Sequence, residues 1–350
     1  MLSAILSRQC DKKLLLLFTI FWLASAQADE VILQDGSVLK GEVVDKEKDV
    51  LKFKTSFAGT INIKWEQVKK LHVDKPVKIL LDNEEIILAN TITKDEQQVT
   101  LEQDIKESST TMNSLDNAYI NPPEWRQGIG YKFSGRFNFA LKSQQGNTVK
   151  DELDLDGRAE FRWVDERLQF TGELENDTSS DETTSDNWLL ISRFDRFYEK
   201  RLYRGGFLSI EHDRFADLRI RTIGGLHMGK EFYKSRALNL DASIGLAYIY
   251  EDNYTVADDR YFAGVWGLDY DNYMFDEFTQ FYHRQLGRWS LEDTRRLIFK
   301  SWTGFRFPLV HGFFGDILAS VELEADYDSQ PNPGVGTTDT TFRIKLGYQW

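Results

Sequence analysis

The chain has 350 residues, and 56 Asp and Glu against 43 Lys and Arg give it a formal net charge of −13. A surface that binds nucleic acid needs a clustered excess of basic side chains, so this balance argues against nucleic acid as a partner. The single cysteine, Cys10, excludes a disulfide framework and a thiolate metal site.

The first 28 residues have the three-part layout of a secretory signal peptide. Lys12 and Lys13 precede an apolar run over residues 14–23, and Ala26-Gln27-Ala28 offers a cleavage site. Crossing a bilayer as a helix takes about 20 residues, so the run is too short to span one. We therefore expect export from the cytoplasm and removal of this segment together with the only cysteine.

Residues 29–106 predict a small all-β domain, with short alternating strands broken by turns at Asp35-Gly36 and Ala58-Gly59. The same strand-and-turn pattern occurs a second time, more weakly, with Asp82-Asn83 in the place of Asp35-Gly36. An internal duplication of the domain is therefore open. The first pass resembles the SH3-like or Sm-like barrels of bacterial envelope proteins. The matching segments are Asp35-Gly36, 41–43, 55–63 and 68–71. Those positions are structural, so the resemblance implies a periplasmic SH3-like fold without active residues.

Residues 107–127 predict a linker, because the segment is polar, lacks periodicity and is broken by Asn121-Pro122-Pro123. From residue 128 to 350 the pattern changes to long strands. Phe137 and Phe139 fall on one face of the first of them, whereas Arg136 and Asn138 fall on the other.

Twelve segments of residues 128–350 carry this alternation. They are 128–142, 149–163, 168–174, 188–198, 202–211, 218–228, 238–250, 261–270, 275–284, 296–307, 313–327 and 341–350. The pattern predicts an all-β fold, a transmembrane antiparallel β-barrel of about twelve strands, and the 13% share of aromatic residues suits its girdles. Ten strands are also open, because the fourth and fifth segments are irregular.

The predicted turns differ in length, as they do in outer-membrane barrels. Residues 164–166 and 308–312 make short turns, whereas 176–186, 251–259 and 328–340 are long and polar. With the N-terminal domain in the periplasm, the short turns would face the periplasm and the long ones the outside.

The last predicted strand, residues 341–350, has an apolar face opposite a charged one. The apolar face consists of Phe342, Ile344, Leu346, Tyr348 and Trp350. This strand resembles the closing strand of bacterial outer-membrane barrels, which implies a signal for the barrel-assembly machinery. An edge strand of a soluble sheet is the alternative interpretation.

A set of charged residues falls on the predicted inner face of the barrel. They are Lys132, Arg136, Glu152, Asp154, Asp156, Arg158, Glu160, Arg162, Glu173, Arg219, Arg221, Asp241, Glu322, Glu324, Arg343 and Lys345. Both signs are present, so the set predicts either a pore that selects small solutes by charge and diameter or an ion-pair network that fills a narrow interior. Barrels of about eight strands are filled and those of about sixteen hold a channel, so about twelve strands favour a narrow or packed lumen.

Two further segments carry a family resemblance. They are the Gly146-Asn147-Thr148 turn and the run E-H-D-R-F-A-D-L-R-I-R-T-I-G-G-L over residues 211–226. With them, roughly the last two-thirds of the chain resembles the salt-stress-induced outer-membrane proteins, the YdiY-like group. Gln145 and Lys230 stand where that group usually has Ser and Tyr. The group has no established reaction, so the resemblance implies an outer-membrane barrel and a link to osmotic stress.

Catalytic motifs are absent from the sequence, which has no G-x-S-x-G, no H-E-x-x-H and no Walker glycine loop. The five histidines show no metal-ligand spacing, so we expect no metal and no cofactor. An outer-membrane phospholipase would need a Ser and His pair, for which His283 with an outward-facing serine such as Ser290 is the candidate. A histidine in the barrel wall is the ordinary interpretation.

Two polar turns suggest ligands only weakly. Residues 213–217 suit lipopolysaccharide headgroups or bridging cations, but a turn stabilised by its own Asp and Arg is the simpler interpretation. Residues 176–186 are acidic and suit calcium, although such a run is usually a solvated loop.

The sequence therefore predicts a non-enzymatic protein of the Gram-negative outer membrane, either a narrow small-solute channel or a structural barrel. Its expected partners are outer-membrane lipid and lipopolysaccharide, and the assembly machinery during biogenesis. Two alternatives remain. One is an outer-membrane lipid-modifying enzyme, and the other is a membrane anchor for a periplasmic domain that binds a protein or peptidoglycan.

Overall fold

The computed structural model describes residues 28–350 apart from 48, 82–84, 96–97, 104–107, 113, 117, 145–149, 181, 200, 235–237, 276–277 and 313–314. It divides into two compact units, Met1–Pro122 and Pro123–Trp350. The predicted signal peptide, except residue 28, lies outside the described residues, as do the Asp82-Asn83 and Gly146-Asn147-Thr148 turns. No helix in the described part of the chain is long and apolar enough to cross a membrane.

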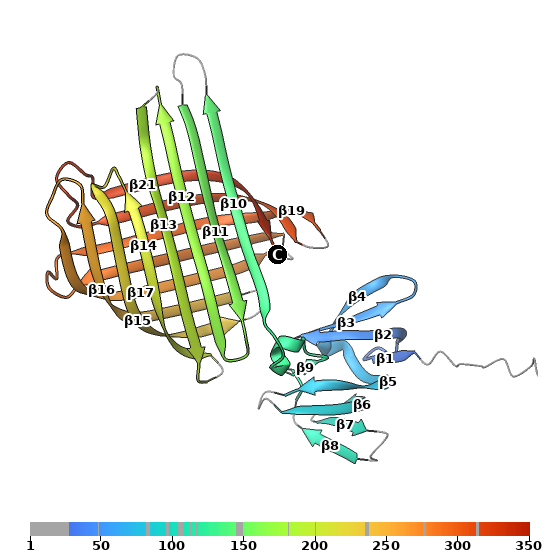
Figure 1. The fold of residues 1–350 in the computed structure, drawn as a ribbon. Coiled ribbons are helices and arrows are strands. Elements are labelled where there is room, and N and C mark those ends of the chain that lie inside the picture. The colour runs from blue at the N-terminus through green and yellow to red at the C-terminus, as the bar shows by residue number, and fades with distance from the viewer. Residues whose placement is uncertain are drawn as a thin grey trace, which may run out of the picture. The chain divides into compact units, whose positions relative to one another are not determined.

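The N-terminal unit is an antiparallel β-sheet (Figure 1). Its strands are β1 (Asp29–Leu33), β2 (Val38–Glu47), β3 (Val50–Thr55), β4 (Gly59–Lys64), β5 (Val68–Leu80), β6 (Ile86–Lys94), β7 (Val99–Gln103), β8 (Ser108–Met112) and β9 (Tyr119–Ile120). They are ordered β4-β3-β2-β1-β5-β6-β7-β8, and β9 pairs with β2 and β5. Both passes of the sequence pattern share one core, since Val31, Leu51 and Ile92 pack in the same cluster. The SH3-like assignment and the duplication stay predictions.

Part of the predicted linker instead belongs to this sheet. Strand β8 pairs with β7, and Leu115, Ala118 and Ile120 are buried in the core. The reason is a buried ammonium group: Lys46 donates from Nζ to the backbone carbonyls of Leu115, Asp116 and Ala118 at 2.8, 3.0 and 2.8 Å. A polar segment without periodicity can enter a core when its carbonyls find such a donor.

Replacing Lys46 with methionine should loosen the segment that follows β8. The change keeps the length of the side chain but removes the ammonium donor from three carbonyls, at an expected cost of about 2–3 kcal/mol. Hydrogen exchange on the full chain should then be faster at the amide of Ala118, which donates to the carbonyl of Leu115.

The control for this experiment is Lys52→Met, which removes an exposed ion pair with Asp45 at 3.4 Å. Such pairs contribute little to stability, so exchange should not change in this control. Equal exchange in the Lys46 and Lys52 variants would contradict the assigned role of Lys46.

The second unit is a closed antiparallel barrel of twelve strands, as the sequence predicts (Figure 1). The strands are β10 (Lys132–Gln144), β11 (Lys150–Arg162), β12 (Glu166–Ser179), β13 (Glu182–Phe197), β14 (Leu202–Asp213), β15 (Leu218–Lys234), β16 (Leu238–Asn253), β17 (Asp259–Met274), β18 (Thr279–Ser290), β19 (Leu297–His311), β20 (Asp316–Asp328) and β21 (Thr338–Gln349). Each strand pairs with the next, and β21 pairs with β10 to close the ring.

Several strands are longer than the sequence pattern suggests. Residues 176–186, a predicted loop, belong almost entirely to β12 and β13, which pair as far as Ser179 with Glu182. Figure 1 shows this hairpin and the β10–β11 hairpin rising above the remaining strands. Residues 176–186 of the β12–β13 hairpin are polar on both faces of the strands. The apolar periodicity is therefore lost there, although the backbone hydrogen bonds between the strands continue.

The barrel has two ends, which we name by their turns. At the near end lie the chain before β10 and the last residues of β11, β13, β15, β17 and β19. At the far end lie the last residues of the other strands, and residues 329–337 between β20 and β21 form its longest described turn. The difference in length between the near-end and far-end turns is therefore smaller than the sequence predicts, because β12 and β13 extend into the predicted loop 176–186.

The outer face of the barrel is apolar. Leu226, Ile244 and Ile344 expose 74, 65 and 68% of their surface, and they come from three different strands. At the near end the belt is bordered by aromatic rings, with Phe133 at 4.8 Å from Phe161 and 5.7 Å from Trp350 between ring centroids. In water such a belt would be unfavourable, whereas in a bilayer it is the lipid-facing surface.

The predicted assembly-signal residues lie on this outer face at β21 and its end. Phe342, Ile344, Leu346, Tyr348 and Trp350 all expose between 36 and 68% of their surface. Trp350 exchanges two backbone hydrogen bonds with Gly135 on β10, at 3.0 and 3.1 Å. Its ring covers Gly135, where a Cβ atom would lie 2.5 Å from the indole and 2.8 Å from the carbonyl oxygen of Arg158.

Replacing Gly135 with alanine should therefore weaken the closure of the barrel. The new methyl group would force apart β10, β11 and the Trp350 ring, at an expected cost of about 1–3 kcal/mol. Urea unfolding of the refolded barrel in lipid vesicles measures this loss. Gly264→Ala is the matched control, since a Cβ there meets no atom within 4 Å, and equal midpoints for both variants would refute the packing argument.

Candidate functional site in the barrel interior

Charged side chains cross the barrel between strands that are not neighbours in the wall. Arg158 on β11 donates to both oxygens of Asp269 on β17, at 3.1 and 3.2 Å. These strands lie opposite each other in the ring of twelve. Arg284 on β18 donates to the same carboxylate at 3.0 Å. A bridge between opposite walls passes through the lumen, so these three side chains occupy its cross-section.

Two cations on β21 connect that strand to β11, on the other side of β10. The carboxylate partners are Asp154, Glu175 and Glu324 for Arg343, and Asp156 and Glu322 for Lys345. Both Lys345 contacts are 2.7 Å long. Six residues predicted for the inner face therefore meet here, and Glu175 joins them.

A third group centres on Arg167, which is 95% or more shielded from solvent. Arg167 on β12 pairs with Asp195 at 2.7 Å, Asp241 at 3.1 Å and Glu231 at 3.3 Å, and these acids come from three other strands. His227 lies 2.5 Å from the same Asp195 carboxylate. Sequence reasoning found only Asp241 of this group. The alternation of Arg193 and Asp195 with their neighbours does indicate inward-facing positions. It lies in the fourth predicted strand, residues 188–198, whose pattern is irregular.

Other predicted residues make contacts both across the lumen, from β12 to β19, and between neighbouring strands. Glu173 pairs with Lys300 at 3.4 Å, Arg221 with Glu211 at 2.8 Å, and Glu160 accepts a hydrogen bond from Gln169. Glu152 is half-buried on β11, and Arg136 and Arg162 each have a buried nitrogen without a partner among the described residues. The guanidinium of Arg162 lies 3.7 Å from the ring centroid of Phe197.

Two predicted lumen residues are placed differently. Lys132 is exposed at the start of β10. The side chain of Arg219 is half exposed, pairs with Asp252 at 3.1 Å and covers the Tyr254 ring at the far-end rim. The physical reason is a register irregularity between Leu218 and Ile220, which interrupts the simple alternation of faces.

The phospholipase pair does not form. His283 contacts Thr303 Oγ1 at 2.8 Å through Nδ1, whereas Ser290 Oγ accepts from the backbone amides of Glu292 and Asp293. His283 and Ser290 are seven residues apart on one strand, so they lie on opposite faces and about 23 Å from each other.

The polar turn at residues 213–217 is held by its own carboxylates. Asp213 accepts from the amides of Phe215 and Ala216 at 3.0 and 2.9 Å, and Asp217 accepts from the hydroxyl of Thr255 at 2.8 Å. This favours the self-stabilised turn over a ligand site. Within the described ranges, no group of three or more His, Cys, Asp or Glu residues is arranged to hold a metal ion.

Inner-face residues of the described part of the chain line a cavity toward each end of the barrel. The far-end cavity has a volume of about 240 Å³ and reaches down to Arg193 and His227, whereas the near-end cavity of about 300 Å³ reaches up to Arg158, Arg167 and Arg284. No residue lines both cavities. The cross-barrel ion pairs therefore separate the two spaces.

Residues 137–350 match the family described as "Protein of unknown function, DUF481". The chain belongs to the DUF481 family. The match begins inside β10 and continues through the other barrel strands, so the family covers nearly the whole barrel and none of the N-terminal sheet. No curated protein matches the chain.

Several solved structures match the chain at low similarity. A NanC porin has 9% identity and a TM-score of 0.38, covering 63% of this chain and 99% of its own. The translocator domain of the autotransporter NalP from Neisseria meningitidis has 13% identity and a TM-score of 0.34, with 64 and 88% covered. The outer membrane channel DcaP of Acinetobacter baumannii has 10% identity and a TM-score of 0.30, with 92 and 93% covered. Scores this low carry no conclusion about function.

Replacing Asp195 with asparagine should destabilise the barrel strongly. The fully buried carboxylate contacts Arg167, Arg193 and His227. Its loss leaves Arg193 without its carboxylate partner and removes one of three from Arg167, at an expected cost of about 3–5 kcal/mol. The urea midpoint of the refolded barrel measures the change. The matched control is Asp252→Asn, whose partner Arg219 is half exposed, and it should shift the midpoint little. Similar shifts in both variants would contradict the argument.

Proposed function

We propose that this protein spans the outer membrane of a Gram-negative bacterium and acts as a narrow conduit for small polar solutes, with an ion-pair layer across its lumen. The observation that carries the proposal is the bridge from Arg158 to Asp269 between opposite walls. It divides a polar, membrane-sized barrel into one cavity at each end. We expect the resting protein to conduct weakly, because a solute must pass or displace that layer.

The membrane location is supported by the outer face and by strand length. A tilted transmembrane strand needs about 9–11 residues, and the barrel strands have 12–17. The apolar belt and the aromatic border at the near end fit a bilayer. The predicted leader is consistent with export, and we place the N-terminal sheet and the near end in the periplasm.

The partners expected from the sequence remain proposals. Lipopolysaccharide and outer-membrane lipid would contact the belt, and the assembly machinery would recognise the aromatic face of β21. The SH3-like character of the N-terminal sheet, a periplasmic protein or peptidoglycan as its partner, and a link to salt or osmotic stress all rest on the sequence resemblances. We propose a non-enzymatic role, supported by the separation of His283 from Ser290.

Single-channel recording in a planar bilayer tests the conduit. Wild-type protein should give small, steady currents, and Arg158→Ser should increase the conductance several-fold, since it removes the bridging guanidinium but keeps the Asp269–Arg284 pair. Loss of one inward cation should also shift the preference towards cations.

The control variant is Arg295→Ser. It changes an exposed far-end turn in which Arg295 pairs only with its neighbour Asp293 among the described residues, so its conductance should equal that of the wild type. A properly inserted Arg158→Ser barrel that stays silent would refute the conduit and favour a structural barrel.

A further inference from the structure

The lumen is not uniformly polar. On the inner face of the far half, apolar side chains replace the charges found elsewhere. Those that line the far-end cavity include Leu189, Phe207, Ile223, Val265, Ile298 and Trp302. Several are nearly fully buried in the wall, with Ile223 in a cluster formed by β15, β16 and β17. A path built only for water and ions needs no such patch, because barrel interiors that carry water are polar.

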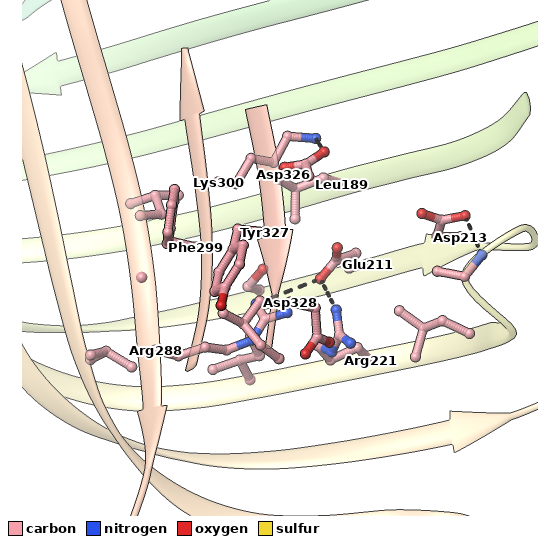
Figure 2. A pocket seen from close by; sticks show the side chains of 18 of the residues that line it. Leu189, Glu211, Asp213, Arg221, Arg288, Phe299, Lys300, Asp326, Tyr327 and Asp328 are labelled. Carbon is pink, nitrogen blue, oxygen red and sulfur yellow. Dashed lines mark hydrogen bonds and ion pairs between the residues drawn. The ribbon is translucent and has the colours of Figure 1, made fainter. Parts of the chain in front are cut away.

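Charged groups face this patch across the same cavity. Figure 2 shows Glu211 between two guanidinium groups, with Arg221 on one side and Arg288 on the other. Arg221 holds Glu211 at 2.8 Å and also pairs with Glu251. Arg288 approaches Glu211 only to 3.9 Å, and its side chain makes no hydrogen bond to any of the described residues. Its side chain is 17% exposed and lines the cavity, and Glu211 is the one carboxylate within 4 Å of it among the described residues.

The cavity is also covered. Residues 329–337 lie over its mouth, and Gln330, Pro331 and Asn332 line it. Asn332 donates from Nδ2 to the carbonyl of Ala216 in the β14–β15 turn at 3.3 Å. Ser329 Oγ accepts from the amide of Leu297, the first residue of β19, and donates to the carbonyl of Arg295. The loop thus connects two sides of the far end and partly encloses the space.

We propose that the far-end cavity binds a small amphipathic anion, with a ring or short chain against the apolar patch and a carboxylate beside Arg288. A carboxylate can accept two parallel hydrogen bonds from one guanidinium, which gives both attraction and orientation. A cavity of about 150 Å³ holds benzene, so a space of about 240 Å³ suits a ligand of about ten non-hydrogen atoms.

The amphipathic anion is a solute class for the proposed conduit, so its passage through the barrel depends on that proposal. Binding is measured separately from transport, so the two proposals can fail independently. A protein that does not conduct could still bind the anion, which would refute only the conduit. A protein that conducts but does not bind the anion would refute only the binding site.

The experiment is a fluorine NMR titration of the full mature protein in lipid nanodiscs, with para-fluorobenzoate as the probe. Neutral para-fluorobenzyl alcohol and cationic para-fluorobenzylamine have nearly the same shape and report the effect of charge. Empty nanodiscs give the contribution of the lipid. We expect saturable binding of the benzoate and at least about tenfold weaker binding of the other two probes.

Two variants locate the site. Arg288→Gln should weaken benzoate binding at least about tenfold, and Ser209→Leu should weaken it by filling space, since Ser209 also lines the cavity. Arg295→Gln, outside the cavity, should leave binding unchanged. Benzoate signals equal to those of empty nanodiscs would overturn the proposal. Equal binding of all three probes, or benzoate binding that survives both Arg288→Gln and Ser209→Leu, would overturn it as well.

Discussion

The barrel is narrow enough for an arginine and an aspartate on opposite walls to meet in the lumen, and much of its interior depends on that fact. Alternation places one face of each strand inside, and a charge removed from water there is tolerated only beside an opposite charge. Arg158 meets Asp269 across the full width of the ring, and Arg167 gathers acids from three other strands. The same contacts that satisfy these charges also lie across the lumen, so the stability of the barrel and the proposed restriction of passage would have one cause.

The N-terminal sheet solves a related problem with a single cation. Its core is apolar, and Lys46 is the charged side chain that enters it to hold three carbonyls of a segment without apolar periodicity. An ammonium group serves this purpose because it offers three donors in different directions. In the barrel, Arg158 and Arg167 pair with carboxylates, whereas in the sheet Lys46 donates to backbone carbonyls.

The far half of the lumen departs from this pattern, and the departure connects the fold to the proposed ligand. Where Ile223 and Val265 take inward positions, the cavity has an apolar wall opposite Glu211 and Arg288. An ion would gain nothing from that wall, whereas an amphipathic anion would use both sides. The ion-pair layer beneath the cavity then forms the floor of a binding space as well as an obstacle to passage.

The strands and their faces could be read from the sequence, because a period of two is a local property of the chain. It separated Arg343 and Lys345 from Phe342 and Ile344, and it led to the twelve-stranded barrel. Tertiary structure alone decided which charges meet. Arg167 and Asp195 face each other in the register of β12 and β13, and His227 reaches the same carboxylate from β15. Arg158 and Asp269 meet only because the ring closes, a bulge places Arg219 at the rim, and Lys46 draws residues 115–118 into the core. Each of these depends on register and closure between segments distant in the chain, about which local alternation carries no information.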